Sequence, residues 1–282
     1  MSPVLAATAW SQMSGLGRRP RVTLTPVKNW VRATDPRASV AWLDGLEDAL
    51  TGYWAPPGYA DSTWILHAMY QNEALAGLGT HDDVEKDLVG RGLAQPDVVS
   101  GIDLTASTMD TGTPLGFVER PGPEWSRLRW RERFGPSMAE QLAERSYPPN
   151  DLALRTGASW SASIAAPPEG SMDEASLMAL VDVLATITGG AQDAPITAFY
   201  GEVPANDYEQ PTAFTGPLGA LRELTDTLDA TPSNLWPADR SWFVLTDWDI
   251  TSTGIWGTRQ TIDAVRRHPD LETIDWTRGA TS

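Results

Sequence analysis

Two aspartates two residues apart form the pattern in this chain that best suits chemistry. Asp247 and Asp249 stand in the stretch from Ser241 to Trp256, where apolar residues alternate as they do along a β-strand. Residues i and i+2 of a strand share one face, so the two carboxylates are expected about 7 Å apart. That spacing suits a divalent cation or a general acid and base, with His67 as a further candidate catalytic residue. Alternatively, both aspartates lie exposed near a strand end, where charge discourages pairing of sheet edges.

Three residues near the aspartates are candidates for binding. Thr251 and Thr253 continue the acidic face, so their hydroxyls are expected to form hydrogen bonds beside the carboxylates. Trp248 lies between the aspartates and is the third candidate. Exposed tryptophans can form a platform for carbohydrates or cations, although tryptophans more often anchor a core.

The chain has three histidines, and any His-dependent catalysis or metal site must use one of them. His81 and Asp82 begin a His-Asp-Asp run that could supply metal ligands beside Asp247 and Asp249. Thr80 followed by three polar residues is also an ordinary helix start, with Thr80 as the N-cap. His67 interrupts an apolar strand, where the alternative to a catalytic role is a hydrogen bond to a backbone carbonyl or to a tyrosine.

The composition argues against several classes of function. Lys and Arg number 21 against 37 Asp and Glu, and a net charge of −16 opposes binding to nucleic acids or anionic membranes, which require clustered positive charge. Because cysteine is absent, no thiolate nucleophile and no Cys-ligated metal site can form. No nucleotide-binding, α/β-hydrolase or zincin motif occurs, so we expect no tightly bound cofactor. Without a signal peptide or a run of about 18 apolar residues, a cytoplasmic location is expected.

Alternating strands and one-sided helices predict an α+β fold with a mixed or mainly antiparallel sheet. Apolar residues at spacings of three and four predict helices over 38–51, 172–188 and 258–267. Ser171 and Glu174 have the spacing of a capping box at the start of the second helix. Strands are expected over the ranges 61–70, 157–166, 195–201, 241–250 and 270–276, with a Thr-Ser-Thr-Gly turn at 251–254.

The length of 282 residues suggests two lobes. We expect a loosely ordered arm over 1–20, an N-terminal α+β lobe over 21–148 and a C-terminal α+β lobe over 149–282. The segments 60–66 and 238–244 read Ala-Asp-Ser-Thr-Trp-Ile-Leu and Ala-Asp-Arg-Ser-Trp-Phe-Val. Two similar lobes with equivalent strands would explain this match, and so would a shared turn-to-strand chemistry.

Three segments carry a resemblance to other proteins. They are TWILHAMY from Thr63, SNLWPADRSWFVLTDWDITST from Ser233 and HPDLETIDW from His268. In this combination the chain resembles an uncharacterised group of actinobacterial proteins. Its C-terminal unit, an aromatic strand with Asp-x-Asp followed by a short helix, is also similar to the ends of many small bacterial proteins of unknown role. The resemblance implies no assigned activity and no catalytic residue.

The sequence supports two hypotheses of function. An acidic surface with many tryptophans predicts a protein-binding module, for example an immunity-type protein, that recognises a basic partner. The alternative is an enzyme that uses Asp247 and Asp249, with or without a divalent metal and with His67 as a further group, for example in specialised metabolism. No oligomeric state can be predicted from the sequence.

Overall fold

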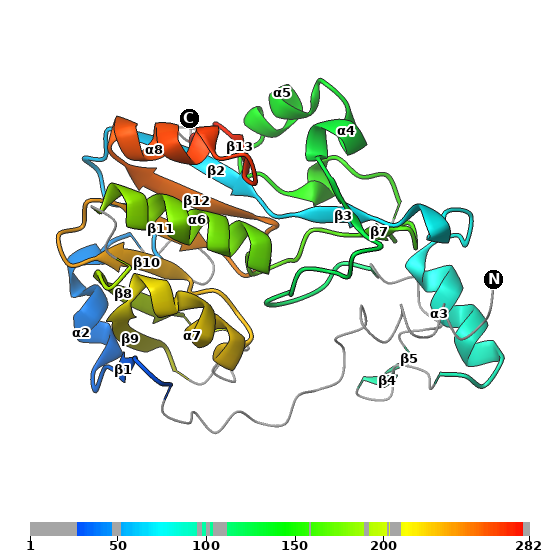
Figure 1. Ribbon diagram of the computed structural model, residues 1–282, viewed down its shortest axis with the longest axis horizontal. Coiled ribbons are helices and arrows are strands. Elements are labelled where there is room, and N and C mark those ends of the chain that lie inside the picture. Colours follow the sequence, from blue (N-terminus) through cyan, green and yellow to red (C-terminus); the bar gives the residue numbers. More distant parts are fainter. Residues whose placement is uncertain are drawn as a thin grey trace.

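The main element of the fold is a large antiparallel sheet (Figure 1). The computed structural model describes residues 27–46, 52–94, 98–99, 102–103, 112–157, 159–188, 192–201, 203 and 210–278. Within these ranges the sheet has eight strands, which are in spatial order β1 (Val31–Arg32), β9 (Thr212–Pro217), β8 (Pro195–Tyr200), β10 (Asn234–Pro237), β11 (Phe243–Thr246), β12 (Ser252–Gly257), β2 (Asp61–Leu66) and β13 (Glu272–Ile274). Every neighbouring pair is antiparallel, which confirms the predicted α+β class.

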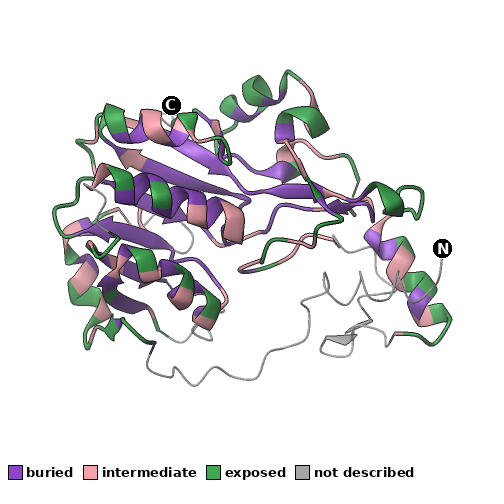
Figure 2. Ribbon diagram, viewed as in Figure 1, coloured by how far each residue is buried: buried purple, intermediate pink, exposed green. Residues whose placement is uncertain are grey.

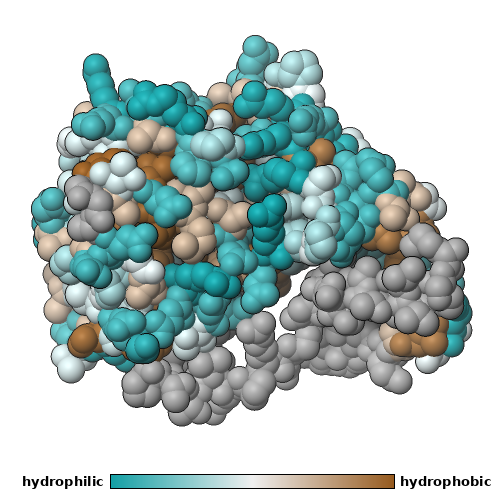
Figure 3. All heavy atoms as spheres, in the orientation of Figure 1, coloured by the Kyte–Doolittle hydropathy of each residue, from teal (hydrophilic) through white to brown (hydrophobic). Residues whose placement is uncertain are grey.

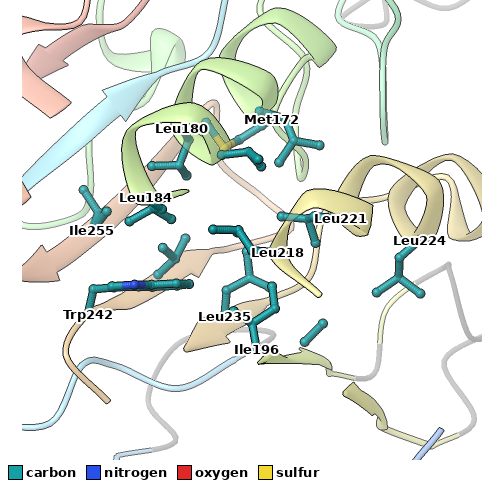
Figure 4. Close-up of a cluster of buried hydrophobic side chains, with 14 of the residues drawn as sticks. Met172, Leu180, Leu184, Ile196, Leu218, Leu221, Leu224, Leu235, Trp242 and Ile255 are labelled. Carbon is teal, nitrogen blue, oxygen red and sulfur yellow. The ribbon is translucent and has the colours of Figure 1, made fainter. Parts of the chain in front are cut away.

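Three helices cover one face of this sheet: α6 (Glu174–Ile187), α7 (Leu221–Leu228) and α8 (Arg259–Arg267). The helices predicted over 172–188 and 258–267 are therefore confirmed. Their sheet-facing sides are buried, whereas their outer sides carry exposed and half-buried residues (Figure 2), and the face they form has hydrophobic patches among hydrophilic side chains (Figure 3). Figure 4 shows Leu180 and Leu184 of α6 pointing toward Trp242 and Leu235 of the sheet. No helix in the described ranges is long and apolar enough to cross a membrane.

The other face of the sheet packs against aromatic side chains. Trp236 and Phe243 stack with ring centroids 6.0 Å apart, and Trp64 meets Trp256 edge to face at 5.7 Å. This face is covered by α2 (Pro36–Val40) with the 3-10 turn η1 (Ala41–Leu43), and by α4 (Trp130–Phe134) and α5 (Met138–Ala143). Because this aromatic face and the helix-covered face are both buried, the sheet is the common core of the molecule.

The helix predicted over 38–51 is wrong in its bounds. Asp35 caps α2 by accepting the backbone N–H groups of Arg37 and Ala38, so the helix begins earlier. α2 ends at Val40 and the 3-10 turn η1 ends at Leu43, and Gly45 has a φ of 82° that stops helical winding. Residues 47–51 lie outside the described ranges.

The strand predicted over 61–70 divides into two strands in different sheets. β2 belongs to the large sheet, whereas β3 (Met69–Gln71) pairs with β6 (Ser126–Leu128) and β7 (Ile164–Ala165) in a second, three-stranded sheet. His67 and Ala68 form the junction. The strand predicted over 157–166 contributes only the two residues of β7, and the small pair β4 (Val98–Val99) and β5 (Ile102–Asp103) completes the strands of the described ranges.

The alternating stretch around Asp247 ends sooner than predicted. Trp242 and Val244 pack on the helix side and Phe243 and Leu245 on the aromatic side, as alternation requires. The strand stops at Thr246, the turn occupies 247–250, and the residues expected to turn at 251–254 instead begin β12. The later elements of this unit, α8 and β13, are confirmed.

The capping box predicted at Ser171 is also wrong. Asp173 is the N-cap of α6 and accepts the N–H of Ser176 at 2.9 Å. Ser171 is fully buried, and its hydroxyl accepts the N–H of Thr231 at 2.8 Å. A carboxylate two residues later thus replaces the hydroxyl as the cap.

The large sheet takes strands from both sides of the boundary expected near 148. β1 and β2 come from the first half and the other six strands from the second, while the division into two lobes stays a prediction. The matching segments 60–66 and 238–244 are not structurally equivalent. Their aligned tryptophans, Trp64 and Trp242, lie on opposite faces of the sheet. A shift of one residue exchanges the two faces of a strand, so the two segments do not superpose residue by residue, and the origin of the match stays a hypothesis.

Candidate functional site

Three loops meet where β11 ends and β12 begins. They are the turn 247–250, the segment 149–155, and the segment 168–170. The Asn150 side-chain amide donates to the carbonyl of Asp249 at 3.1 Å, and the N–H of Gly170 donates to the carbonyl of Ile250 at 3.0 Å. The three loops bring together four carboxylates, Asp151, Glu169, Asp247 and Asp249, which we call the acidic end of the sheet.

The structure separates the roles of the two aspartates that the sequence singled out. Asp247 is buried, and its Oδ1 accepts the N–H of Asp249 at 3.2 Å across the turn. Asp249 is exposed. The pair therefore belongs to a turn stabilised by an aspartate side chain, and the expected placement on one face of a strand is wrong.

Glu169 is fixed from both sides by backbone contacts. Its N–H donates to the carbonyl of Pro114 at 2.9 Å, and its own carbonyl accepts the N–H of Gly116 at 3.1 Å. Gly170 has a φ of 75°, and a Cβ there would come within 2.5 Å of the carbonyl oxygen of Trp248. Only glycine permits this close approach, so Gly170 holds Glu169 beside the aspartate turn.

Asp151 lies behind the surface in an ion pair. One carboxylate oxygen accepts the Thr251 hydroxyl at 2.9 Å, and the other lies 3.2 Å from Nε of Arg155. Burial raises the pKa of Asp151 to about 6, and hydrogen bonds from the Thr251 hydroxyl and from the backbone N–H groups of Asp151 and Leu152 oppose that rise. Burial also lowers the pKa of Arg155.

Glu169 is the most perturbed carboxyl of the acidic end. Burial, followed by the charges of Asp151 and Asp249, raises its pKa to about 7, and Arg155 acts in the opposite direction. Two carboxylates and one guanidinium thus act on one half-buried side chain. The negative charge that gathers here exceeds what Arg155 can neutralise.

His67 is fully buried behind the acidic end. Its Nδ1 lies 2.6 Å from the carbonyl of Pro168, and its Nε2 lies 2.9 Å from the hydroxyl of Thr253, which in turn contacts the hydroxyl of Thr246 at 2.9 Å. Burial lowers the pKa of His67 to about 4, so the ring is neutral. With 0% exposure and both nitrogens hydrogen-bonded, His67 joins the strands β2 and β12 rather than facing a substrate.

The remaining residues predicted from the sequence differ in their exposure to solvent. Thr251 and Thr253 are buried, so their hydroxyls support Asp151 and His67 instead of reaching the surface. Trp248 is half-buried at the turn. Two apolar side chains at the same place are conspicuously exposed: Leu152, next to Asp151, at 52%, and Leu115, bridged to Glu169, at 56%.

His81 and Asp82 are not part of the acidic end. They begin α3 (His81–Gly90), at the right-hand end of the molecule in Figure 1. Thr80 caps this helix with a complete capping box, which confirms the helix-start interpretation. His81 is buried, and its Nε2 lies 2.8 Å from the carbonyl of Ile164. Within the described ranges, no group of three or more His, Asp or Glu side chains is arranged to hold a metal ion.

Sequence reasoning missed Asp151, Arg155 and Glu169. They are separated from Asp249 by about a third of the chain, and they lie on connecting segments whose only regular element is the short 3-10 helix η3 (Asp151–Ala153), so no hydrophobic period marks them. One signal was present: Asn150-Asp151 and Glu169-Gly170 each follow a Pro-Pro pair, at 148–149 and 167–168. Such pairs mark stiff loops, which can hold polar side chains in place.

Comparison with known proteins gives no family for this chain. No protein-family model matches it, and no curated protein or solved structure matches it either. The function must therefore be inferred from the geometry of the acidic end.

Proposed function

We propose that this protein is a binding module whose acidic end recognises a basic protein partner. The observation that carries the proposal is the environment of Glu169, where burial and two neighbouring carboxylates raise the pKa of the carboxyl to about 7. A lysine or arginine brought by a partner would relieve this repulsion, because an opposite charge nearby favours the ionised carboxylate. The net charge of −16 adds a long-range attraction for a basic protein.

Exposed apolar groups beside the carboxylates support binding of a protein. Leu115 and Leu152 are each more than half exposed, and Trp248, next to Asp249 in the turn, is half-buried. Protein interfaces combine a few apolar or aromatic anchors with charged groups around them. A partner segment that alternates basic and apolar side chains fits this surface. An immunity-type protein, which blocks a basic target, is one form of this proposal.

Short peptides test the proposal without knowledge of the partner. The full chain is titrated calorimetrically with an Arg/Leu peptide and with a Gln/Leu peptide of the same length. We expect the Arg/Leu peptide to bind, more weakly as salt is added, and the Gln/Leu peptide not to bind. The variant Glu169→Gln with Asp249→Asn should weaken binding about tenfold, equivalent to about 1.4 kcal/mol.

A control variant separates the site from the overall charge. Glu140→Gln with Asp182→Asn removes the same two charges from α5 and α6, away from the acidic end. This variant should bind the Arg/Leu peptide like the parent. Equal losses in both double variants would mean that net charge alone attracts the peptide, and the proposal would be withdrawn.

The second candidate function is an enzyme, favoured by one observation. A carboxyl group with a pKa of about 7 can give or take a proton at neutral pH, and Glu169 has this property. Asp249 would be its exposed neighbour, whereas Asp247 and His67 are buried and hydrogen-bonded. If a divalent metal takes part, Mg²⁺, Mn²⁺ or Ca²⁺ should raise the melting temperature of the parent protein and not of Asp249→Asn.

A further inference from the structure

A hollow of about 510 Å³ lies at the opposite end of the strands that form the acidic end. It is lined by the segment 56–60, by Trp42 and Arg240, which are in contact, and by Ser241, Gly257 and Thr258. These residues precede β2 and β11 and follow β12. We call this place the Arg240 hollow. Its volume is in the range of sites that bind small molecules.

Arg240 presents its charge to the hollow in a fixed orientation. The guanidinium carbon lies 4.0 Å from the centre of the Trp42 ring, so the planar group rests on the indole. The backbone is held as well, since its N–H donates to the carbonyl of Pro237 at 2.9 Å and its carbonyl accepts the Tyr59 hydroxyl at 3.1 Å. Its φ of 55° is uncommon for a residue with a side chain, and such outliers often accompany function.

The N–H groups of this guanidinium have no acceptor among the described residues. Asp239 is the adjacent carboxylate, but its Oδ1 accepts the backbone N–H of Ser241 at 3.0 Å. An arginine that stacks on a ring keeps its edge free for a carboxylate or phosphate, to which it can donate two hydrogen bonds. The unpaired edge of Arg240 therefore favours an anionic ligand.

The rest of the lining favours an organic ligand over a simple ion. Pro56, Pro57, Tyr59 and Trp42 supply rigid and largely apolar surface. Tyr59 stays protonated because burial raises its pKa to about 12, so it adds no negative charge. Thr258, the N-cap of α8, is one of the lining residues, so the N-terminus of this helix lies at the hollow. The first N–H groups of a helix attract negative charge.

We propose that the Arg240 hollow binds a small organic anion. Arg240 holds its carboxylate or phosphate group, and the first turn of α8 adds N–H donors. The flat apolar part of the ligand lies against Pro56, Pro57 and Tyr59. This site is separate from the acidic end and does not depend on the function proposed there.

Four probes test the site in calorimetric titrations of the full chain: benzoate, phenyl phosphate, inorganic phosphate and neutral benzamide. We expect benzoate or phenyl phosphate to bind at least tenfold more tightly than inorganic phosphate and benzamide. The better of the two aromatic probes identifies the anionic group. If inorganic phosphate binds as well as phenyl phosphate, if benzamide matches benzoate, or if neither aromatic anion binds, the proposal is overturned.

Two variants at Arg240 locate the binding. Arg240→Gln should weaken binding of the better probe at least tenfold, and Arg240→Gly should do the same while suiting the positive φ, so that loss of folding cannot explain the result. Arg267→Gln removes one exposed arginine from the other end of α8 and should bind like the parent. Unchanged binding in both Arg240 variants would overturn the assignment. The Glu169→Gln and Asp249→Asn pair should leave this binding unchanged.

Discussion

The three strands β2, β11 and β12 have side chains of opposite charge at their two ends. At the acidic end, carboxylates outnumber the guanidinium that faces them, and hydrogen bonds join the loops closely. At the Arg240 hollow, a guanidinium without a partner among the described residues faces open space. The strands between them are buried and largely apolar. The sheet thus separates the two ends, and the charged side chains at each end come from short, stiff loops that contain Pro-Pro pairs.

The largest change in stability is expected when Trp242, a core side chain between the two ends, is removed. Trp242 lies two residues after Arg240 and immediately before β11, the strand that leads to the acidic end, and it is almost fully buried. Trp242→Ala should destabilise the protein by roughly 3–5 kcal/mol through the cavity it leaves. Chemical unfolding measures this effect, with the exposed Leu152→Ala as a control that changes little. A Trp242→Ala protein as stable as the parent would mean that the strands do not hold the two ends together.

A second prediction concerns His67, which anchors the acidic end. Its folded-state pKa of about 4 lies below the usual 6.5, so its contribution to stability is complete above pH 6.5 and is lost as pH falls through 4. The loss should reach about 3 kcal/mol. The measurement is the free energy of unfolding from pH 4 to 7 for the parent and His67→Gln. The difference between the two proteins should shrink toward acid pH, and a constant difference would contradict the buried neutral ring.

Glu169 should act in the opposite direction over an overlapping range of pH. Its pKa is raised to about 7, so the folded protein holds this proton more tightly than the unfolded chain. The resulting stability is present below about pH 4.5 and is lost as pH rises through 7. After allowance for solvent screening the loss is about 1–2 kcal/mol. Glu169→Gln should gain stability relative to the parent as pH rises from 4.5 to 8. If the free energies of unfolding of the two proteins changed in parallel with pH, the neighbouring carboxylates would not be raising the pKa of Glu169.

The smallest effect is expected for the aspartate turn. In the double variant Asp247→Asn with Asp249→Asn, the side-chain oxygen at 247 can still accept the N–H of residue 249. Melting temperature should therefore change little, with each site within about 0.5 kcal/mol. Binding of the Arg/Leu peptide should weaken all the same. A large loss of stability would show that the charge of Asp247, beyond its hydrogen bond, holds the turn.

Elements with one clear period were predictable from the sequence. α8 has one apolar stripe, α6 is a long run that is apolar around most of the helix, and β8 lies between turn residues. The end of β11 was not predictable, because the alternation continues through Trp248 and Ile250 although a side-chain hydrogen bond turns the chain at Asp247. The Thr80 cap of α3 could be recognised from the sequence, whereas the choice of Asp173 over Ser171 at the start of α6 depends on the contact of Ser171 with Thr231.

The candidate site was predictable only in part. Asp249 and Trp248 could be found because they lie in one short aromatic stretch. Asp151, Arg155 and Glu169 reach the site through tertiary contacts with distant loops, which no local pattern encodes. The alternative for His67, a bond to a backbone carbonyl, is confirmed by its contact with Pro168. Its position at a change of sheet was not visible in a sequence that reads as one continuous strand.

The place of β2 in the sheet also bears on how the protein is made. β2 lies between β12 and β13, and Leu66 pairs with Ser252, which follows it by 186 positions. At a synthesis rate of about 5–20 residues per second, β2 leaves the ribosome roughly 10–40 s before either neighbour. During that time both its hydrogen-bonding edges and the Trp64 ring lack their partners, and such strands are prone to aggregate. The nascent chain should therefore depend on a chaperone that shields β2 until β12 and β13 have been synthesised.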